Sequence, residues 1–351
     1  MKKMFALLLA SALIFSLAAC GGPASAPADA GGKEPAQTQP KDDAPSVEPV
    51  TLTLGTIYAA DHPASLAVEA AIAEIKEASG GQITIQHYPA SQMGDNDELA
   101  EGLVAGSVDF NVQSLSYFNE KCPEFEIDSC FFVYQDADHV YKVWDGEIGE
   151  KFNAMAEENY GVTVLDAWLY GNRVMTTKNT AVRSPKDLSG LKMRVPDHAI
   201  WVDMMSSFGA EATPVAFSEL YMALNQGVVD GQENPVPTIM SSKFNEVQNY
   251  LCLTNHKVET IYVMVDQSTW NKLSEEQRDI ISTAFKNARA VNNDAIEQQT
   301  VDGVAEFEAS GGTVIREDEI DSAAFAACVS ETLETKYPYL LDIYTEIQSA
   351  K

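Results

Sequence analysis

The fold is decided by residues 50–112, which read VTLTLGTIYAADHPASLAVEAAIAEIKEASGGQITIQHYPASQMGDNDELAEGLVAGSVDFNV. Apolar and polar residues alternate over 50–54, as in a half-buried strand. A helix is expected next, with Asp61 as its cap, Pro63 in its first turn and Gly80-Gly81 at its end. Its apolar stripe consists of Leu66, Val68, Ile72 and Ile75. Strands over 83–88 and 108–112 with a helix over 95–106 between them complete a β-α-β-α-β order. This order predicts a mainly parallel sheet with helices on both faces.

The same rhythm continues along the chain. The patterns predict strands over 162–168, 191–195 and 261–266, an extended segment over 230–234, a helical turn over 184–187, and helices over 200–208 and 217–226. Ser274-Glu-Glu-Gln277 is a capping box that opens a helix running to about Ala309 without an internal proline. A helix of this length can brace two lobes.

The N-terminus predicts export. Lys2 and Lys3 precede the apolar segment 5–19, which is too short to span a bilayer. Small residues before Cys20 resemble a bacterial lipobox, in which the cysteine carries the lipid chains, such as palmitate, of a membrane anchor. The alternative is an ordinary signal peptide followed by a chance cysteine. We therefore expect a lipoprotein signal peptide over 1–19 and a flexible lipid-anchored linker over 20–49, rich in Ala, Pro, Gly and Asp. The expected location is the outer face of the cytoplasmic membrane or the periplasm.

The net charge of the chain limits the classes of ligand that it can bind. A formal net charge of −29 makes nucleic acid an improbable ligand, because phosphate binding requires a basic face. An anion would have to be bound by a few local cations. The chain has six arginines, which are Arg173, Arg183, Arg194, Arg278, Arg289 and Arg316.

Cysteine and histidine spacing indicates neither a metal nor a catalytic site. Cys122, Cys130, Cys252 and Cys328 match no zinc pattern, and the five histidines are scattered. Cys122 and Cys130 are close enough in sequence for a disulfide, with buried free thiols as the alternative. No nucleophile with a base is evident, and the many acidic pairs are what a charge-rich chain produces by chance, so we expect no enzyme, no cofactor and no metal.

Several longer motifs identify a family. They are Gln92-Met-Gly94, Gly171-Asn-Arg173, Asp187-Leu-Ser-Gly-Leu-Lys-Met-Arg-Val-Pro196, Thr213-Pro-Val-Ala-Phe-Ser-Glu-Leu-Tyr221 and Gly227-Val-Val-Asp-Gly-Gln-Glu-Asn-Pro235. Over about residues 50–300 the chain resembles the solute-binding proteins of tripartite ATP-independent periplasmic (TRAP) transporters, of the dicarboxylate-binding type. Many motifs in the same order are more specific than one short match.

The resemblance implies a two-lobe α/β fold of the periplasmic-binding-protein type, with a ligand cleft between the lobes and a long helix spanning both. It places lobe I over 50–170 plus 260–298 and lobe II over 171–259 plus 299–351. It also implies a monomeric receptor that binds a small carboxylate and delivers it to a small and a large membrane permease subunit. The alternatives are a binding lipoprotein that serves an ATP-driven importer or a sensor kinase, since fold does not specify function.

The resemblance also implies ligand-binding residues. Arg194 matches the arginine that grips the substrate carboxylate, a role that suits the planar, permanently charged guanidinium. Arg173 matches a second arginine near the substrate; for both, an ordinary ion pair is the alternative. Asn234 matches a residue that hydrogen-bonds the substrate, and Phe217 matches an aromatic ring that packs on it, with a core position as the alternative.

The residues that select the substrate are less clearly marked. Family contacts also come from segments that correspond to 56–61 and 113–117 here, which makes Gln113 and Ser114 candidates. Trp168, together with Tyr170, His198 and Trp201, lies beside family contact positions and forms either an aromatic wall or core. The candidate ligands are dicarboxylates, keto or hydroxy acids, sugar acids, sialic acid and aromatic acids.

Overall fold

The computed structural model of the chain describes residues 49–350. The predicted signal peptide, Cys20 and the linker up to residue 48 lie outside the described residues. None of the helices within 49–350 has the length and apolar character that crossing a bilayer requires.

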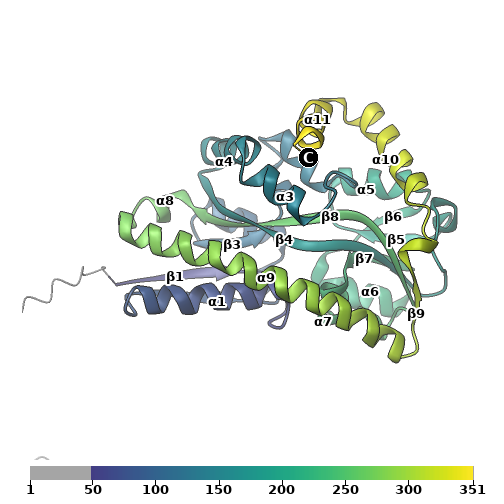
Figure 1. Cartoon of the computed structure of the whole chain (residues 1–351), viewed down its shortest axis with the longest axis horizontal. Helices are drawn as coiled ribbons and strands as arrows, with labels where there is room; N and C mark the ends of the chain where they lie inside the picture. The colour runs from purple at the N-terminus through teal and green to yellow at the C-terminus, as the bar shows by residue number, and fades with distance from the viewer. Residues whose placement is uncertain (1–48, 351) are drawn as a thin grey trace, which may run out of the picture. The chain divides into compact units, whose positions relative to one another are not determined.

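Within this range the strands form one mixed sheet in the order β2-β1-β3-β8-β4-β7-β5-β6, with β9 added beside β8 (Figure 1). The strands are β1 (Val50–Gly55), β2 (Ile83–Tyr88), β3 (Phe110–Gln113), β4 (Val162–Thr177), β5 (Lys192–Val195), β6 (Glu211–Pro214), β7 (Gly231–Pro235), β8 (Tyr250–Asp266) and β9 (Thr313–Ile315).

The two ends of the sheet are parallel, but its centre is not. β1 pairs in parallel with β2 and β3 at one end, and β5 pairs in parallel with β6 and β7 at the other. Between them β4 and β8 run antiparallel to each other along most of their length. The expectation of a mainly parallel sheet is therefore wrong for the central strands, which join the two ends.

Strands β4 and β8 are much longer than the predicted segments 162–168 and 261–266. The charged residues that interrupt their apolar pattern, such as Arg173 and Glu259, are buried and pair with each other across the two strands. Because their charges are compensated locally, the strands continue through the centre of the molecule.

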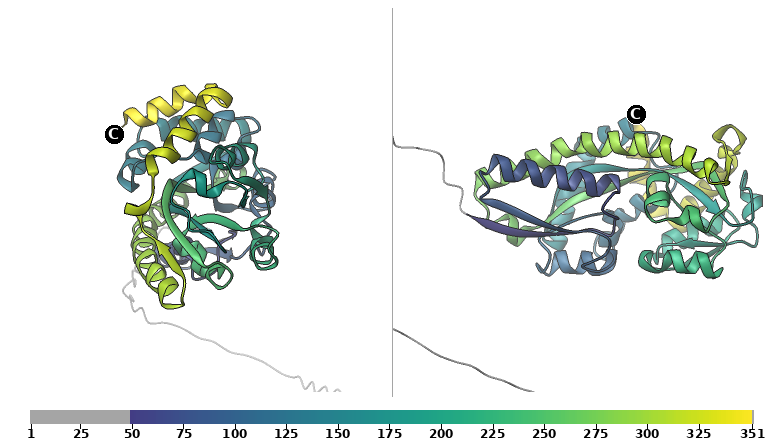
Figure 2. Two further views of the ribbon diagram at one scale, coloured as in Figure 1. Left: turned by 90° about the vertical axis from the view of Figure 1, so that its right-hand side faces the viewer. Right: turned by 90° about the horizontal axis from the view of Figure 1, so that it is seen from below.

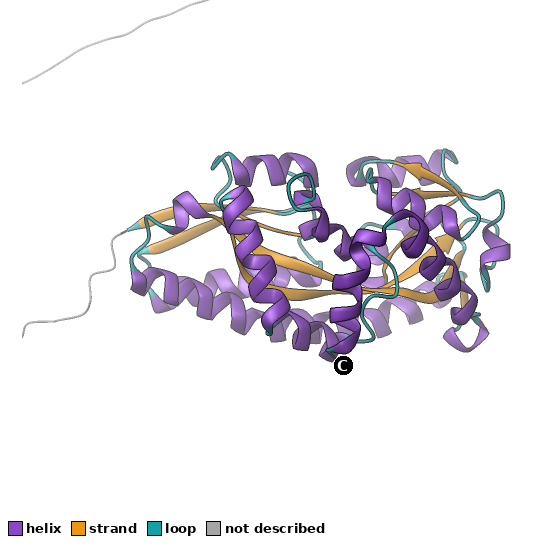
Figure 3. Ribbon diagram, turned by 90° about the horizontal axis from the view of Figure 1, so that it is seen from above, coloured by secondary structure: helices purple, strands orange, loops and turns teal. Residues whose placement is uncertain are grey.

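Helices cover both faces of the sheet, as predicted (Figure 3). They are α1 (Pro63–Ala78), α2 (Asn96–Val104), α3 (Ala137–Trp144), α4 (Glu147–Tyr160), α5 (Ala199–Ser207), α6 (Leu220–Gln226), α7 (Val236–Ser241), α8 (Gln267–Trp270), α9 (Glu275–Ala309), α10 (Ser322–Lys336) and α11 (Leu341–Ser349).

Helix α9 spans both ends of the sheet, and its predicted limits are confirmed. Ser274 caps it and forms the predicted capping box with Gln277. Along its length α9 packs against α1, then β4, then α7 and β9 (Figure 2). Phe285 of α9 is buried in the apolar core around β1–β3, and Phe307 in a second core around α6 and α7. One rigid helix thus contributes to the cores at both ends of the sheet.

Helix α1 begins differently from the prediction. Its cap is His62 and not Asp61, because the His62 imidazole accepts a hydrogen bond from the Ala64 N–H. Leu66 is 41% exposed, so it is not part of the buried stripe. The buried face consists largely of alanines with Val68 and Ile75, and these small side chains let α1 approach α9 closely.

The cysteines of the described region are free thiols. Cys122 and Cys130 flank the 3₁₀ segment Pro123–Ser129 and are buried without bonding to each other. The alternative of buried thiols is the one that this structure has.

Candidate ligand-binding site

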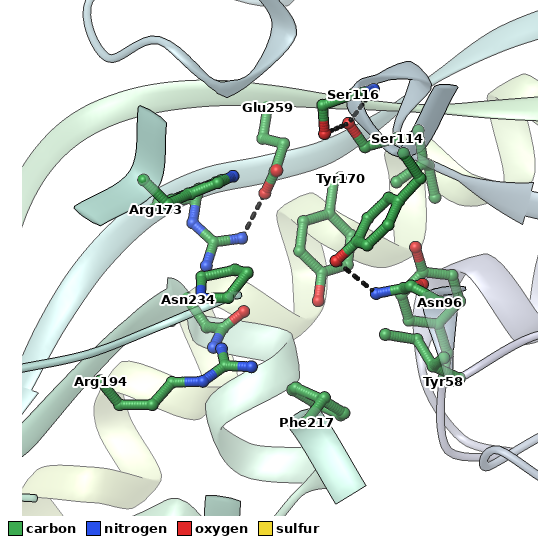
Figure 4. A pocket seen from close by; sticks show the side chains of 15 residues that line it. Tyr58, Asn96, Ser114, Ser116, Tyr170, Arg173, Arg194, Phe217, Asn234 and Glu259 are labelled. Atoms are coloured by element: carbon green, nitrogen blue, oxygen red, sulfur yellow. Dashed lines mark hydrogen bonds and ion pairs between the residues drawn. The ribbon is translucent and has the colours of Figure 1, made fainter. Parts of the chain in front are cut away.

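A cavity lies where the carboxyl ends of the parallel strands at both ends of the sheet converge (Figure 4). Ligands of open α/β sheets bind beyond the carboxyl ends of the strands. The empty space is about 500 Å³, counted out to the solvent opening. Its lining residues are Ile57, Tyr58, Asn96, Ser114, Ser116, Tyr117, Tyr170, Arg173, Arg194, Pro196, Trp201, Phe217, Asn234, Glu259 and Ile261.

Arg194 is the cation without a counter-charge in this cavity. It is the third residue of β5 and is 3% exposed. Its Nε–H donates to the Val215 carbonyl oxygen at 2.9 Å, and no carboxylate within residues 49–350 forms an ion pair with it. Burial lowers the pKa of Arg194 from 12.5 to about 10. The terminal nitrogens of this guanidinium are therefore available to an anion from outside the chain.

Arg173 lines the same cavity but is already paired. Its Nε–H and one Nη2–H donate to the Glu233 carboxylate, the other Nη2–H donates to the Glu233 carbonyl oxygen, and Nη1–H donates to Glu259. Burial lowers the pKa of Arg173, but the two carboxylates outweigh burial and raise it above its usual value. Burial likewise raises the pKa of Glu233, and the Arg173 charge outweighs this effect and lowers the pKa to about 2. Arg173 therefore forms the ion pair that was the alternative to ligand binding. Four of its five guanidinium N–H groups are used in these bonds, and one remains free.

Asn234 and Phe217 lie beside Arg194. Asn234 is the fourth residue of β7, and its Nδ2–H donates to Gln232 Oε1 at 2.6 Å. The Asn234 amide oxygen and its second N–H have no hydrogen-bond partner among residues 49–350 and lie at the cavity (Figure 4). The Phe217 ring centroid lies 5.9 Å from the Arg194 guanidinium carbon, within cation–π range.

The opposite wall carries hydroxyl and amide groups. Ser114 caps the 3₁₀ turn Leu115–Phe118, and its hydroxyl contacts both Ser116 and the buried Asp128 carboxylate. Asn96 donates to the Tyr117 hydroxyl at 2.9 Å, while its Oδ1 is buried without a hydrogen-bond partner in the described region. This wall therefore offers short polar groups and no cation.

Aromatic rings close the cavity from a third side. The Tyr58 ring stacks on the His62 ring, with the ring centroids 4.8 Å apart, and its centroid lies 5.4 Å from that of the Tyr170 ring. The Tyr170 hydroxyl accepts a hydrogen bond from Thr238, whose oxygen in turn bonds the His62 ring. These hydrogen bonds hold the Tyr170 ring, and the Tyr58 ring is held by its contacts with the His62 and Tyr170 rings.

The arrangement has the groups that an anion-binding site requires, namely one guanidinium without a carboxylate partner in residues 49–350 and several neutral donors and acceptors. In the part of the chain from 49 to 350, no group of three His, Cys, Asp or Glu side chains is arranged to hold a metal ion.

Comparison with known proteins identifies the family. Residues 54–337 match the model of bacterial extracellular solute-binding proteins, family 7. The chain belongs to this family. It is 33% identical over 244 residues to the sialic acid-binding periplasmic protein SiaP of Vibrio cholerae, an alignment that covers 70% of this chain and 76% of that protein.

Two solved structures of TRAP periplasmic solute-binding proteins give the same result. The protein from Roseobacter denitrificans with bound L-galactonate is 30% identical, has a TM-score of 0.80, and covers 87% of this chain and 99% of its own. The protein from Polaromonas with bound D-erythronate is 28% identical, has a TM-score of 0.80, and covers 86% of this chain and 99% of its own. The predicted two-lobe α/β fold is confirmed for this member of family 7.

Most of the predicted site residues lie together in the family 7 chain. The cavity is lined by Arg194, Arg173, Asn234, Phe217 and Ser114, and also by Tyr170 and Trp201. Contact of any of them with a ligand stays a prediction.

Three of the candidate residues, Trp168, Gln113 and His198, do not line the cavity. The His198 ring packs edge-on against the ring of the cavity residue Tyr117, with the ring centroids 4.5 Å apart. Trp168 is fully buried in the core beside Phe285, and its Nε1–H donates to Asp166 at 3.0 Å. Trp168 precedes Tyr170 on β4 by two residues, but a register shift between Leu169 and Gly171 follows it, so only Tyr170 lines the cavity. Gln113 ends β3 and is also buried, with an amide that has no hydrogen-bond partner in residues 49–350.

Two polar cavity residues were missed by the sequence-based prediction, Glu259 and Asn96, and so were the apolar Pro196 and Ile261. Glu259 had a detectable signal, because Lys257 and Glu259 are charged residues inside an otherwise buried strand. Charged residues at such positions require partners, and partnered charges beside a cavity are candidates for function. Asn96 had no comparable signal, since an asparagine at the start of a helix is common.

Proposed function

We propose that this family 7 protein is the extracytoplasmic receptor of a TRAP transporter and that it captures a small carboxylate with Arg194. The observation that carries the proposal is the buried Arg194 guanidinium with no carboxylate partner in residues 49–350. A buried cation without a counter-charge is costly, and a bound carboxylate would offset that cost through bidentate hydrogen bonds.

Release to a transporter would require the cavity to open. The proposed lobes, 50–170 plus 260–298 and 171–259 plus 299–351, agree with two features of the central strands. The chain passes from one proposed lobe to the other at Gly171 of β4 and at Glu259 of β8. These two residues are paired with each other in the sheet. Gly171 has a φ of +123° and follows a register shift, so the backbone there already departs from a regular strand. We assign the hinge to this pair and to the part of α9 near residue 298, where the proposed lobes meet.

The partners of the receptor would be a small and a large membrane subunit. This choice over an ATP-driven importer or a sensor kinase is supported by the TRAP structures that the chain resembles. Adjacent genes for both membrane subunits would agree with it, whereas an adjacent sensor-kinase gene without permease genes would contradict it. We propose that the receptor acts as a monomer.

The membrane anchor belongs to the same proposal. Cys20, after the signal peptide 1–19, would carry the lipid chains, and residues 20–49 would tether the receptor at the extracytoplasmic surface. A Cys20→Ser variant should then leave the membrane fraction and lose labelling by radioactive palmitate. Continued labelling of this variant would show that Cys20 is not the lipidated residue.

A thermal-shift screen against a library of acids tests the binding function directly. Saturation at 100 times Kd stabilises a protein by about 2.7 kcal/mol. For about 300 residues, with an unfolding entropy of about 0.6 kcal/mol/K, the expected rise in Tm is about 4 °C. Carboxylates should give this rise, and the matched primary amides should not. Equal shifts with acids and amides would refute the proposal, because they would show that no charge is recognised.

A further inference from the structure

Glu259 is an unexpected residue in a cavity that binds anions. It is 5% exposed, lines the cavity, and follows Lys257 by two residues on β8. A carboxylate at this position repels an anionic ligand that comes close to it. The presence of Glu259 therefore has to be explained by the chemical group of the ligand that lies beside it.

Glu259 forms ion pairs with two cations. One carboxylate oxygen accepts from Arg173 Nη1–H, and the other lies 3.2 Å from Lys257 Nζ. Lys257 is 3% exposed, packs its ammonium 5.4 Å from the Trp201 ring centroid, and does not line the cavity. Since an ionised carboxylate has about four acceptor sites, these two contacts leave about two acceptor sites on Glu259 unused.

The surroundings of Glu259 suit hydroxyl groups and not a second carboxylate. Among the described residues, the cations that line the cavity are Arg194 and Arg173, and Arg173 already donates to two glutamates. The other polar groups on the wall are uncharged, and Asn96 Oδ1 is a buried acceptor without a donor. A carboxylate placed there would find only cations that are already paired with glutamates, whereas a hydroxyl group would find acceptors.

We propose that Glu259 determines specificity: it accepts hydrogen bonds from ligand hydroxyls and rejects a second carboxylate. The ligand class is then the hydroxylated monocarboxylate, with its acid group on Arg194 and a hydroxyl group on Glu259. This inference rests on the proposed function, in which Arg194 holds the ligand carboxylate. It excludes the dicarboxylates that remained among the candidates.

Matched pairs of acids test the inference with the wild-type protein. D-Erythronate and meso-tartrate differ only in whether the terminal carbon is a CH₂OH group or a carboxylate, and D-galactonate and galactarate differ in the same way. Butyrate and hexanoate supply the acid group without hydroxyls. Calorimetric titration should give a Kd at least 10-fold lower for the aldonate than for its dicarboxylate in the pair that fits the cavity. The aldonate should also bind at least 10-fold more tightly than the alkanoate of equal length.

Variants assign the selectivity to Glu259. Glu259→Gln retains an acceptor oxygen and removes the charge, so the preference for the aldonate over the dicarboxylate should fall at least 10-fold. Because this change leaves Lys257 and Arg173 short of one counter-charge, Lys257→Met/Glu259→Gln is a second variant in which the charge pair is removed together. Circular dichroism shows whether each variant is folded.

Four results would overturn the inference. They are a dicarboxylate that binds the wild type as tightly as its aldonate, an alkanoate that does so, a wild-type preference retained by the folded variants, and no binding by any acid of these pairs. The proposed function then stands or falls separately on whether any other carboxylate of the library raises Tm.

Discussion

Replacing Arg194 with methionine should make the ligand-free protein more stable while abolishing binding. Methionine fills a similar length and carries no charge. An arginine that serves the fold through an ion pair would have the opposite effect on stability when replaced. The sign of the stability change therefore distinguishes a ligand anchor from a structural residue.

The magnitude follows from the environment of Arg194. Burial lowers its pKa from 12.5 to about 10, and one pKa unit corresponds to 1.36 kcal/mol, so the charged form is disfavoured in the fold by about 3 kcal/mol. At neutral pH the group is charged in both the folded and the unfolded chain. The cost is thus present throughout the physiological range and decreases only above about pH 10, where the folded protein can release the proton. Loss of the hydrogen bond to the Val215 carbonyl oxygen destabilises the methionine variant by about 1 kcal/mol. For a ligand-free protein that keeps the arrangement described here, the net gain is about 2 kcal/mol, or about 3 °C in Tm. A ligand-free wild type that opens and returns Arg194 to water would show a smaller gain.

Binding should change in the other direction. Removing one partner of a buried charge pair costs about 2–5 kcal/mol, so Kd should rise at least about 30-fold. Arg194→Lys keeps the charge but loses the planar fork of donors, and its affinity should lie between those of the wild type and the methionine variant. Arg316→Met is the matched control: Arg316 is exposed and paired with Glu308, so its loss should leave Kd unchanged and Tm within about 2 °C.

Differential scanning calorimetry without ligand and isothermal titration with the tightest acid of the library measure both effects. The reasoning is refuted if Arg194→Met unfolds at a lower temperature than the wild type and still binds the acid with the same Kd.

The remaining predictions concern the framework of the site. Glu233→Gln leaves the buried Arg173 with one carboxylate, so the free energy of unfolding in urea should fall by about 3 kcal/mol; a loss below 0.5 kcal/mol, within the ordinary range for exposed positions, would contradict the pairing. His62 accepts a hydrogen bond from the Ala64 N–H, so only the neutral ring fits, and burial lowers its pKa to about 3. Its contribution to stability is complete above about pH 6.5 and is lost as the pH falls from 6.5 towards 3, by about 2 kcal/mol at pH 5; His62→Gln should flatten this slope in urea titrations, and an unchanged slope would assign it to other groups. In a Cys20→Ser chain, thiol titration after denaturation should count the four cysteines of the described region, and a count of two would indicate a disulfide between Cys122 and Cys130.

The elements that the sequence predicted well are those with local signals. Helix α9 was located from the Ser274 capping box and the absence of proline, and β1, β2 and β5 from short alternating runs bounded by turns. The cap of α1 was misplaced by one residue, because Asp61 and His62 are both plausible caps and only the tertiary bonds of His62 decide between them. The full length of β4 and β8 was not predicted, since charged residues ordinarily end a buried strand and their partners here are distant in sequence.

The site residues show the same difference between local sequence signals and contacts that are distant in sequence. Arg194 and Asn234 follow short motifs and lie in the cavity as expected. Trp168 and Tyr170 are two residues apart on β4, and which of them reaches the cavity depends on a register shift after Leu169 that no local pattern marks. Glu259 depends on the register of β8 against β4, which pairs it with Gly171. The residue that we propose selects the ligand is thus fixed by strand pairing over a separation that sequence patterns do not cover.

The cost of burying Arg194 also bears on how an empty receptor behaves. In the arrangement described here the Arg194 guanidinium is nearly inaccessible to water and has no carboxylate partner within residues 49–350, which disfavours this arrangement without ligand by about 3 kcal/mol. If opening the hinge returns Arg194 to water, the same energy favours the open form about 150-fold, and a bound carboxylate removes the bias. We therefore infer that Arg194 both holds the ligand and keeps the empty receptor open. Small-angle scattering of ligand-free Arg194→Met should then give a smaller radius of gyration than that of the ligand-free wild type. Equal radii would show that the opening of the receptor does not depend on this charge.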